Sequence, residues 1–453
     1  MGWEASYDGW VIAIGALAAF ACALPGTFLL LRGMSMMGDA ISHAVLPGIA
    51  LGFLVSGTRD SIWMFLGALV AGLLAAVLSQ ALHRMGRLEH GAAMGVVFTS
   101  LFALGLILIV QAAGRVELDP HCVLEGAIEW APLDMVDVFW GWLTVPRAVP
   151  VLVIMLLVNL TVVIACYKEM KIAAFDPDMA RASGIDARIM NQVLMIITAA
   201  TCVACFEVVG SILVVALLVV PPATARLLSD RLPVVLVLAC LIGIVMAFLG
   251  HFASGSVPGW FLADIEDVST SGMMAVMAGF LFVLAWVLSP RHGLVMRAVH
   301  RLRLRVRIAA EDVLGLLYRC EERQEQLTAA QVRQALMKAA SIGGVTARLA
   351  MARIRRQGWA ELGTTSCHLS DEGRVLATEV VRSHRLWEAW LWRNIKLPAD
   401  HVHGSAMRLE HVTDAGMRDQ LAAETEATEV DPHGKPIPDS GGEADPSPDS
   451  TVE

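Results

Sequence analysis

Long apolar runs occur throughout the first 300 residues of the chain and are absent from the remainder. A helix needs about 20 mostly apolar residues to cross the ~30 Å hydrocarbon layer of a bilayer. We therefore predict nine membrane-spanning helices, with a short second span and a very tight connection between the sixth and seventh. They lie near residues 10–31, 42–56, 61–82, 92–112, 146–166, 189–207, 209–229, 232–252 and 271–288.

The pattern after residue 308 is that of short amphipathic helices. We predict a helix over 309–326, a second over 329–339 with Thr328 as its N-cap, and a third over 345–358 after a turn at 341–344. Short strands at 359–362 and 367–370 follow, which completes the element order of a winged helix-turn-helix. Ser370 then caps a helix over 371–395, and Pro398 opens one over 399–412. The predicted fold is an all-α polytopic membrane bundle followed by a winged helix-turn-helix and a helical domain.

The composition supports a division of the chain into a membrane-embedded part and a part exposed to water. The chain is 56% apolar and 17% charged, whereas a soluble domain averages about 45–50% and about 25%, so a single soluble domain is excluded. The net charge of −9 conceals a contrast, because residues 301–423 carry 19 basic and 14 acidic side chains while the end of the chain is acidic. The eight cysteines are scattered and suggest no disulfide framework.

The distribution of Lys and Arg predicts the orientation of the bundle, since cytoplasmic loops collect positive charge. With the N-terminus outside, eleven of the 14 basic residues before residue 301 fall on the cytoplasmic side. We therefore expect an N-out, C-in membrane protein, with everything after Pro290 in the cytoplasm. Residues 291–308 form a basic amphipathic connector whose arginines, from Arg297 to Arg307, are expected to meet anionic headgroups.

Three segments of the membrane half carry polar or helix-breaking residues. Asp39 and His43 are four residues apart and share one helix face, which suits a divalent transition metal in transit or, equally, a polar cluster at the interface. In FDPDMARASGI, Asp176 and Pro177 open a short helix that Gly184 can close; it is either a contact for a partner protein or an ordinary surface loop. Pro221 and Pro222 are expected to kink or break the seventh span.

Together, GMSMMGDAISHAVLPGIALG, FDPDMARASGI and VGSILVVALLVVPPATARLL resemble the permeases of bacterial zinc, manganese and iron ABC importers over roughly residues 10–290. The resemblance implies a dimeric permease that receives metal from an extracytoplasmic binding protein and is powered by a separate ATPase. It places Asp39 and His43 in the metal pathway. It also implies a coupling helix that contacts the ATPase, with Phe175, Asp176, Pro177, Ala182 and Gly184 as its candidate residues.

The chain contains no GxxxxGK[ST] phosphate loop, since its one Gly-Lys pair, Gly434-Lys435, is followed by Pro. We therefore expect no enzymatic activity in this chain and place ATP hydrolysis in a separate subunit.

The third helix of the predicted winged helix-turn-helix is basic. An isolated basic helix is more often a solvated surface, but the complete order of three helices and a wing favours nucleic-acid binding. The candidate DNA-binding residues are Thr346, Arg348, Arg353, Arg355 and Arg356.

Two later helices carry metal-binding side chains at helical spacing. His384 and Glu388 are i and i+4 on one helix, while His403, Met407 and His411 follow one another at the same spacing on the next, beside Glu410. Imidazole, carboxylate and thioether groups from two helices suit a first-row transition metal.

This half resembles the iron- and manganese-dependent repressors of the diphtheria-toxin-repressor family, through LSDEGRVLATEVVRSHRLWE, HVHGSAMRLEHVTD and DPHGKPIP, from about residue 309 to 438. The resemblance assigns His384, Glu388 and His403 to one metal site and Met407, Glu410 and His411 to another, which Asp312 would complete. Met407 stands where relatives have Cys or a carboxylate, whereas Asp312 is like the manganese-type members, so this mixture of soft sulfur and hard oxygen leaves the choice among manganese, iron and zinc open. A further departure is Gly315, which stands where the manganese-type pattern offers a carboxylate.

We interpret the chain as a metal-importer permease (1–290), a basic linker (291–308), a winged helix-turn-helix (309–370), a helical metal-sensing and dimerisation domain (371–438) and a disordered acidic tail (439–453). The module would act as a metal-dependent repressor on operator DNA. In one alternative it senses metal and inhibits transport in cis without DNA. In another, the membrane half is a receptor rather than a transporter.

Overall fold

The computed structural model describes residues 5–56, 62–86, 89–113, 126, 128–138, 143–256, 268–290, 293–339, 342–425 and 429–439. The expected disorder of the acidic tail concerns residues that lie, apart from Asp439, outside this described part. The chain divides into two compact units, Met1–Met296 and Arg297–Glu453. We call them the membrane unit and the C-terminal unit.

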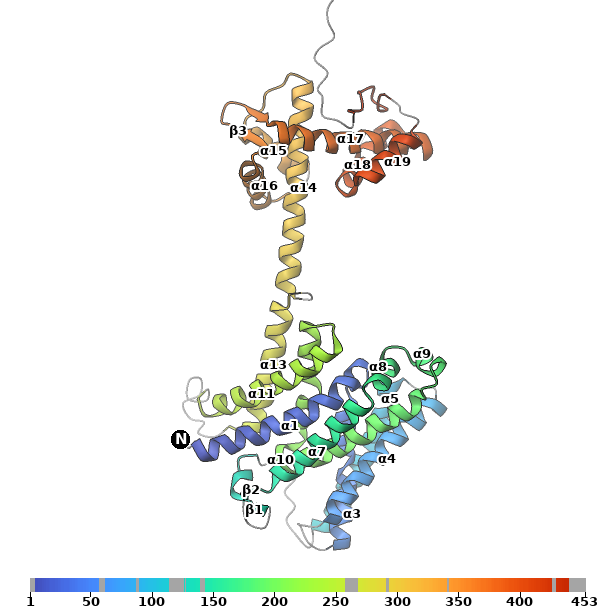
Figure 1. The fold of residues 1–453 in the computed structure, drawn as a ribbon, viewed down its shortest axis with the longest axis vertical. Helices are drawn as coiled ribbons and strands as arrows, with labels where there is room; N and C mark the ends of the chain where they lie inside the picture. Colours follow the sequence, from blue (N-terminus) through green and yellow to red (C-terminus); the bar gives the residue numbers. More distant parts are fainter. Residues whose placement is uncertain are drawn as a thin grey trace, which may run out of the picture. The chain divides into compact units, whose positions relative to one another are not determined.

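The membrane unit is a bundle of helices (Figure 1). Nine candidate spans lie among its described residues, in agreement with the predicted number, and the second of them is made of two short helices, α2 and α3. The helices are α1 (Ala5–Leu31), α2 (Met37–Ala44), α3 (Leu46–Ser56), α4 (Ile62–Gly86), α5 (His90–Ala113), α7 (Ala148–Ala165), α8 (Tyr167–Phe175), α9 (Pro177–Ala182), α10 (Ala187–Leu228), α11 (Leu232–Ser256) and α13 (Thr270–Leu288).

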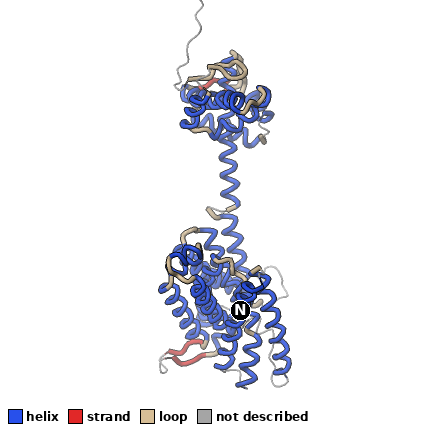
Figure 2. The backbone as a smooth tube through the Cα atoms, turned by 90° about the vertical axis from the view of Figure 1, so that its right-hand side faces the viewer, coloured by secondary structure: helices blue, strands red, loops and turns tan. Residues whose placement is uncertain are grey.

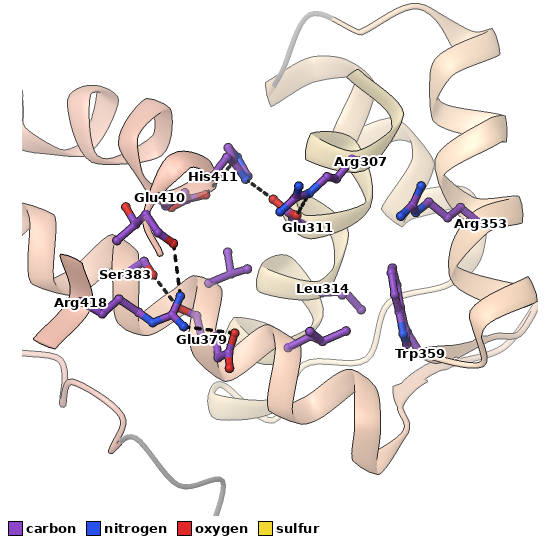
Figure 3. Close-up of a pocket in the computed structure, with 13 residues that line it drawn as sticks. Arg307, Glu311, Leu314, Arg353, Trp359, Glu379, Ser383, Glu410, His411 and Arg418 are labelled. Carbon is purple, nitrogen blue, oxygen red and sulfur yellow. Dashed lines mark hydrogen bonds and ion pairs between the residues drawn. The ribbon is translucent and has the colours of Figure 1, made fainter. Parts of the chain in front are cut away.

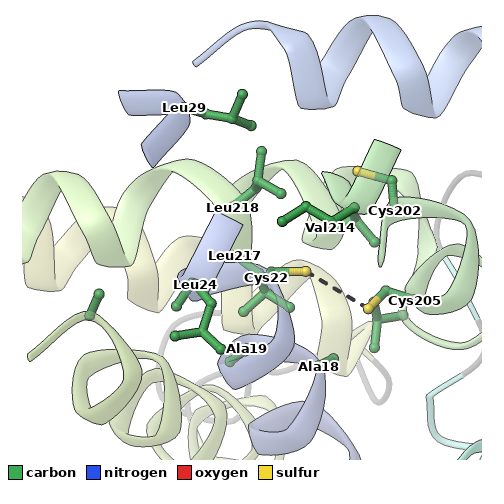
Figure 4. Packing of buried hydrophobic residues seen from close by; sticks show 14 of the residues in the cluster. Ala18, Ala19, Cys22, Leu24, Leu29, Cys202, Cys205, Val214, Leu217 and Leu218 are labelled. Atoms are coloured by element: carbon green, nitrogen blue, oxygen red, sulfur yellow. Dashed lines mark hydrogen bonds between the residues drawn. The ribbon is translucent and has the colours of Figure 1, made fainter. Parts of the chain in front are cut away.

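The core of the membrane unit lies where α1 packs against α10 and α11. Its buried residues include Ala18 and Ala19 of α1 and Leu217 of α10 (Figure 4). Small residues allow close approach of α1 and α11, since a Cβ added at Gly243 would lie 2.9 Å from the Cβ of Ala19. Cys22 of α1 and Cys205 of α10 are fully buried here, with their sulfur atoms 3.8 Å apart. Free cysteines commonly serve as small apolar residues in such cores.

Helix α10 contains both the sixth and the seventh candidate span. Its helical geometry is interrupted at Gly210, whose φ of 78° and ψ of 165° are open to glycine but strained for other residues. Pro221 and Pro222 lie within the helical part of α10, so they do not break the seventh span, and the break falls instead near the predicted tight connection between the sixth and seventh spans. Gly126 packs directly on this break, where an added Cβ would lie 2.4 Å from the Gly210 nitrogen.

Among the described residues, strands form one short antiparallel hairpin in each unit (Figure 2). In the membrane unit, β1 (Met135–Val138) pairs with β2 (Leu143–Pro146), and a 3₁₀ turn, η1 (Ala131–Leu133), precedes them. In the C-terminal unit, β3 (Ala360–Leu362) pairs with β4 (Cys367–Leu369).

The C-terminal unit begins within α14 (Leu294–Glu322), which runs without interruption through the predicted linker and the predicted first helix. The unit continues with α15 (Ala329–Ala339), α16 (Gly344–Gln357), α17 (Asp371–Asn394), α18 (Ala399–Leu409), the 3₁₀ turn η2 (Glu410–Val412) and α19 (Ala415–Glu424). The first three helices and the β3–β4 wing enclose a shared apolar core that includes Val313, Ala350 and Ile354. The predicted winged helix-turn-helix is thus confirmed in its element order.

Local capping explains where these helices begin. The Ser370 hydroxyl accepts a hydrogen bond from the Gly373 N–H at 3.1 Å, and the Thr328 hydroxyl accepts one from the Gln331 N–H at 3.3 Å. Such side-chain acceptors satisfy N–H groups that have no partner inside the helix. Both caps were expected from the sequence.

Candidate functional site

The Asp39–His43 pair lies on α2 of the membrane unit. The His43 Nε2 atom is 3.3 Å from Oδ1 of Asp39, and both side chains are partly exposed. Two ligand atoms bound to one ion at about 2.1 Å lie roughly 3.0–3.4 Å apart, so this spacing suits a shared transition metal. Phe98 and Phe102 of α5 flank the imidazole, with ring centroids 5.7 and 5.4 Å from it, which restricts its rotation.

The segment predicted to contact an ATPase forms α9. The Asp176 carboxylate accepts hydrogen bonds from the backbone N–H groups of Asp178 and Met179, at 3.0 and 2.9 Å, and Pro177 is the first helical residue. The helix ends at Ala182, and Gly184 follows with a φ of 79°. Phe175 and Met179 are exposed on this segment, so it presents apolar side chains that a partner protein can cover.

The first candidate metal site of the C-terminal unit is the His384 cluster, which consists of His384 and Glu388 on α17 and His403 on α18. The His384 Nε2 atom lies 3.1 Å from Oε1 of Glu388 and 3.0 Å from Nδ1 of His403. The His403 Nδ1 atom lies 2.9 Å from the same Glu388 oxygen. These three ligand atoms therefore have the spacing that a common first-row metal ion requires.

His433 also approaches the His384 cluster; it was not among the predicted ligands, although it lies in the DPHGKPIP segment that carries the repressor resemblance. Its Nε2 atom lies 3.9 Å from Oε1 of Glu388. Oδ1 of Asp431 accepts hydrogen bonds from the His433 and Lys435 N–H groups, at 2.9 and 2.8 Å, and so folds the segment into a tight turn. The turn is fastened to α17 by Arg385, which donates to the Pro436 carbonyl at 2.5 Å.

The second candidate metal site is the His411 cluster, made of Asp312 on α14 with Glu410 and His411 on η2. The His411 Nε2 atom lies 3.1 Å from Oδ1 of Asp312 and 3.5 Å from Oε1 of Glu410. Met407 and Gly315 line a cavity of about 100 Å³ together with Asp312 and Glu410. The structure therefore brings all four predicted ligands of this site together and leaves space beside them.

Glu311 is a second residue that sequence reasoning missed. Its Oε2 atom lies 2.9 Å from Nδ1 of His411, on the side of the ring opposite Asp312, and its Oε1 atom accepts a hydrogen bond from Nε of Arg307 at 2.8 Å. The sequence signal at Glu311 is its i+4 spacing from Arg307, which is typical of a surface ion pair.

Electrostatics distinguish these clusters from ordinary surface polar groups. Burial alone would lower the pKa of His411, but hydrogen bonds with Asp312 and Glu311 raise it to about 9. Burial likewise opposes ionisation of Glu388, but hydrogen bonding and attraction to His384 and then to His403 lower its pKa to about 2. In the metal-free chain, protonated imidazoles therefore pair with the carboxylates of each cluster. A divalent cation could replace these protons.

The donor sets fit a divalent transition metal. Imidazole nitrogen predominates in the His384 cluster and carboxylate oxygen in the His411 cluster, and both donor types bind manganese, iron or zinc. The two clusters are also joined, because Nδ1 of His384 lies 2.5 Å from Oε2 of Glu410. Glu410 thus contacts an imidazole of each cluster.

The predicted DNA-binding residues on α16 have two kinds of environment. Arg348 and Arg356 are exposed, and Thr346 is partly buried. Arg353 lies over the ring of Trp359, 5.7 Å from its centroid, and Arg355 donates to the Leu362 carbonyl of the wing at 3.0 Å. These last two arginines therefore also hold α16 against the wing.

Comparisons with known proteins match the two units of the chain to different families. Residues 7–289 match the model of the ABC 3 transport family, and residues 370–439 match that of the iron dependent repressor, metal binding and dimerisation domain. The manganese transport system membrane protein MntD of Bacillus subtilis is 45% identical over 299 residues, which cover 66% of this chain and 98% of that protein. The zinc transport system membrane protein TroD of Treponema pallidum is 42% identical over 289 residues, or 64% of this chain and 76% of that protein.

The chain is also similar to a solved structure, PsaBC from Streptococcus pneumoniae in complex with Fab. The match covers 63% of this chain and 92% of the solved chain, with 28% sequence identity and a TM-score of 0.51. The family match spans nearly the whole membrane unit, and the repressor match contains the His384 cluster together with Glu410 and His411. The chain belongs to the ABC 3 transport family and carries a metal-binding and dimerisation domain of the iron-dependent repressors after its membrane unit.

Proposed function

We propose that this chain carries a divalent transition metal through the cytoplasmic membrane with Asp39 and His43 in the ion pathway. The observation that supports this best is the pair itself, a carboxylate and an imidazole 3.3 Å apart, both accessible, within a metal-permease family. Relatives are named for manganese and for zinc, so both ions are candidate substrates.

The transport machinery would require partners. Because the sequence has no phosphate loop, ATP hydrolysis is assigned to an ABC ATPase that docks on α9 around the exposed Phe175 and Met179. An extracytoplasmic binding protein would deliver the metal, and a second copy of the chain would complete the permease. The distribution of basic residues supports an N-out, C-in orientation, with the C-terminal unit in the cytoplasm.

The C-terminal unit would sense the incoming metal. The His384 and His411 clusters would hold manganese, iron or zinc, and the loaded unit would dimerise. In a dimeric permease, tethering two units raises their effective concentration and so favours this contact. The arginines of α14 between residues 297 and 305 are exposed and follow the last span closely, which supports contact with anionic headgroups.

The output of the sensor has two candidate forms. The exposed Arg348 and Arg356 on α16 favour a repressor that binds operator DNA. Inhibition in cis is favoured by a different observation, namely that Asp312 lies on α14, a helix that begins six residues after α13 ends. Operator binding by the full chain with and without Mn²⁺ separates them, because only the repressor requires a metal-dependent footprint.

Transport is tested by Mn²⁺ and Zn²⁺ uptake into vesicles that contain the full chain, the ATPase and the binding protein. Asp39→Ala and His43→Ala should each abolish uptake while the protein still inserts. Asp8 and His251 provide a matched control, since they form another Asp–His pair, 2.9 Å apart, between α1 and α11; Asp8→Asn should retain uptake. Undiminished uptake by Asp39→Ala would remove that residue from the pathway, and no uptake of any divalent ion by the wild type would favour a receptor.

A further inference from the structure

Glu311 lies immediately before Asp312 on α14 and faces the His411 imidazole. We infer that Glu311, itself fixed by Arg307, is a positioning residue that sets the tautomer and orientation of His411 for metal binding. This inference rests on the proposed role of the His411 cluster as a metal site.

The two nitrogens of the His411 ring face different partners. Nδ1 lies 2.9 Å from Oε2 of Glu311, while Nε2 lies 3.1 Å from Oδ1 of Asp312. Glu410 is also on the Nε2 side, at 3.5 Å. An ion held by Asp312, Glu410 and His411 would therefore bind Nε2, and Glu311 would remain on the far edge of the ring.

Each carboxylate oxygen of Glu311 has its own partner. Oε1 accepts a hydrogen bond from Nε of Arg307 at 2.8 Å, which leaves Oε2 for His411. Figure 3 shows Arg307, Glu311 and His411 in succession along one wall of a cavity of about 230 Å³. The Arg307 side chain is 61% exposed, Glu311 19% and His411 6%, so the succession leads from solvent to a buried imidazole.

The partner of one imidazole nitrogen determines whether the other nitrogen can bind a metal. A neutral imidazole has one N–H donor and one nitrogen lone pair, and the partner of one nitrogen decides which nitrogen carries the proton. A carboxylate at Nδ1 accepts that N–H, so the lone pair is placed on Nε2, toward Asp312 and Glu410. It also makes the ring a more basic ligand.

The other cluster contains the same arrangement. Nδ1 of His384 faces Oε2 of Glu410 at 2.5 Å, and its Nε2 faces Glu388 at 3.1 Å. In both His384 and His411, Nδ1 thus faces a carboxylate, while Nε2 faces the candidate metal ligands. Glu311 would accept the Nδ1–H of His411 in the same way that Glu410 would accept the Nδ1–H of His384.

A direct ligand role for Glu311 is the competing interpretation. The residues whose ligand atoms all lie within 4.8 Å of one another at this site are Asp312, Glu410 and His411. Because Glu311 contacts the opposite nitrogen, an ion on Nε2 would have the imidazole ring between itself and that carboxylate.

The test measures Mn²⁺ binding to the full chain in detergent or nanodiscs, by calorimetry or by loss of the free-ion EPR signal. Loss of such a supporting carboxylate commonly weakens metal binding 10–100-fold. We expect Glu311→Gln to weaken one of two Mn²⁺ binding steps by that factor and to leave the other step unchanged. Glu311→Asp should recover part of the affinity, and Arg307→Gln should cause a smaller loss.

Glu321→Gln is the matched control, because Glu321 lies on the same helix and pairs with an arginine, Arg374, at 2.7 Å. A double-mutant cycle supplies a measurement that a merely structural role would not affect. In a His411→Gln background, Glu311→Gln should cause no further loss at this site, whereas independent structural damage would add.

The outcomes separate the inference from the function on which it rests. If wild-type chain binds a single ion and His411→Gln changes nothing, the proposed metal role of the His411 cluster is wrong. If wild-type chain binds two ions and Glu311→Gln binds both with wild-type affinity, the positioning role of Glu311 is overturned.

Discussion

His384 and Glu410 connect the two candidate metal sites, with Nδ1 of the imidazole 2.5 Å from Oε2 of the carboxylate. Both side chains are almost completely buried, so the contact lies in a region of low dielectric. A metal ion bound at either cluster would therefore affect Glu410 or His384, and these two residues contact each other across the two clusters.

This contact predicts an asymmetry between two conservative substitutions. Glu410→Gln should weaken metal binding at both clusters, because it removes a candidate ligand from one and the carboxylate behind His384 from the other. Glu388→Gln should weaken the His384 cluster alone. Equilibrium dialysis of the full chain against Mn²⁺ measures both effects, and a Glu410→Gln protein with one site of wild-type affinity would contradict the connection.

The raised pKa of His411 predicts how metal binding depends on pH. Its ordinary value is 6.5, and its value in the folded chain is about 9. The protonated form therefore stabilises the metal-free fold fully below about pH 6.5, and that stabilisation is lost as the pH rises through 9. Since a metal must displace this proton, Mn²⁺ affinity should rise about tenfold per pH unit toward pH 9 and then level.

The measurement is a Mn²⁺ titration between pH 6.5 and 9.5 in a Glu388→Gln background, which isolates the His411 cluster. The exposed His401 supplies a control, because His401→Gln should leave the slope unchanged. A flat profile would show that His411 binds no proton that competes with metal.

The arginines of α16 should separate into two classes. Arg348→Ala removes an exposed charge, so it should weaken duplex DNA binding by the metal-loaded chain and reduce the salt-dependence slope by about 1. Arg353→Ala removes a contact with Trp359 and should also lower the thermal stability of the C-terminal unit. Equal stability losses in the two variants would contradict this division.

The break in α10 should tolerate no side chain. Gly210→Ala places a Cβ at a φ of 78° and against Gly126, so we expect reduced yield and a lower thermal midpoint of the membrane unit. Gly279→Ala, on α13 with nothing within 4 Å of the added atom, is the control and should be neutral or slightly stabilising. A Gly210→Ala protein as stable as the control would contradict the requirement for glycine at this break.

The features that the sequence predicted well depend on local signals. Apolar runs of sufficient length located the nine spans, and Ser370 and Thr328 marked helix starts through hydrogen bonds to residues three positions ahead. The chain does not break at Pro221 and Pro222, because both are tolerated inside a helix packed in the bundle. The break lies at Gly210, close to the tight connection predicted between the sixth and seventh spans, and its contact with the distant Gly126 has no local sequence signal.

In the candidate sites too, local spacing could be predicted from the sequence but long-range contacts could not. Helical spacing was enough to select His384 with Glu388 and Met407 with His403 and His411, since successive members of each set are four residues apart. Glu311 and His433 were missed because their roles depend on contacts 100 and 45 residues away, to His411 and Glu388. No periodicity within either segment distinguishes them from surface residues.

The central claim, that one chain joins a metal permease to a metal sensor, is tested most directly by elemental analysis of the full chain purified from metal-replete cells. The account predicts two transition-metal ions per chain, one lost in His411→Gln and the other in Glu388→Gln, with manganese, iron or zinc identified by the same measurement. A full chain that retains no transition metal, or one whose metal content is unchanged by both substitutions, would contradict it.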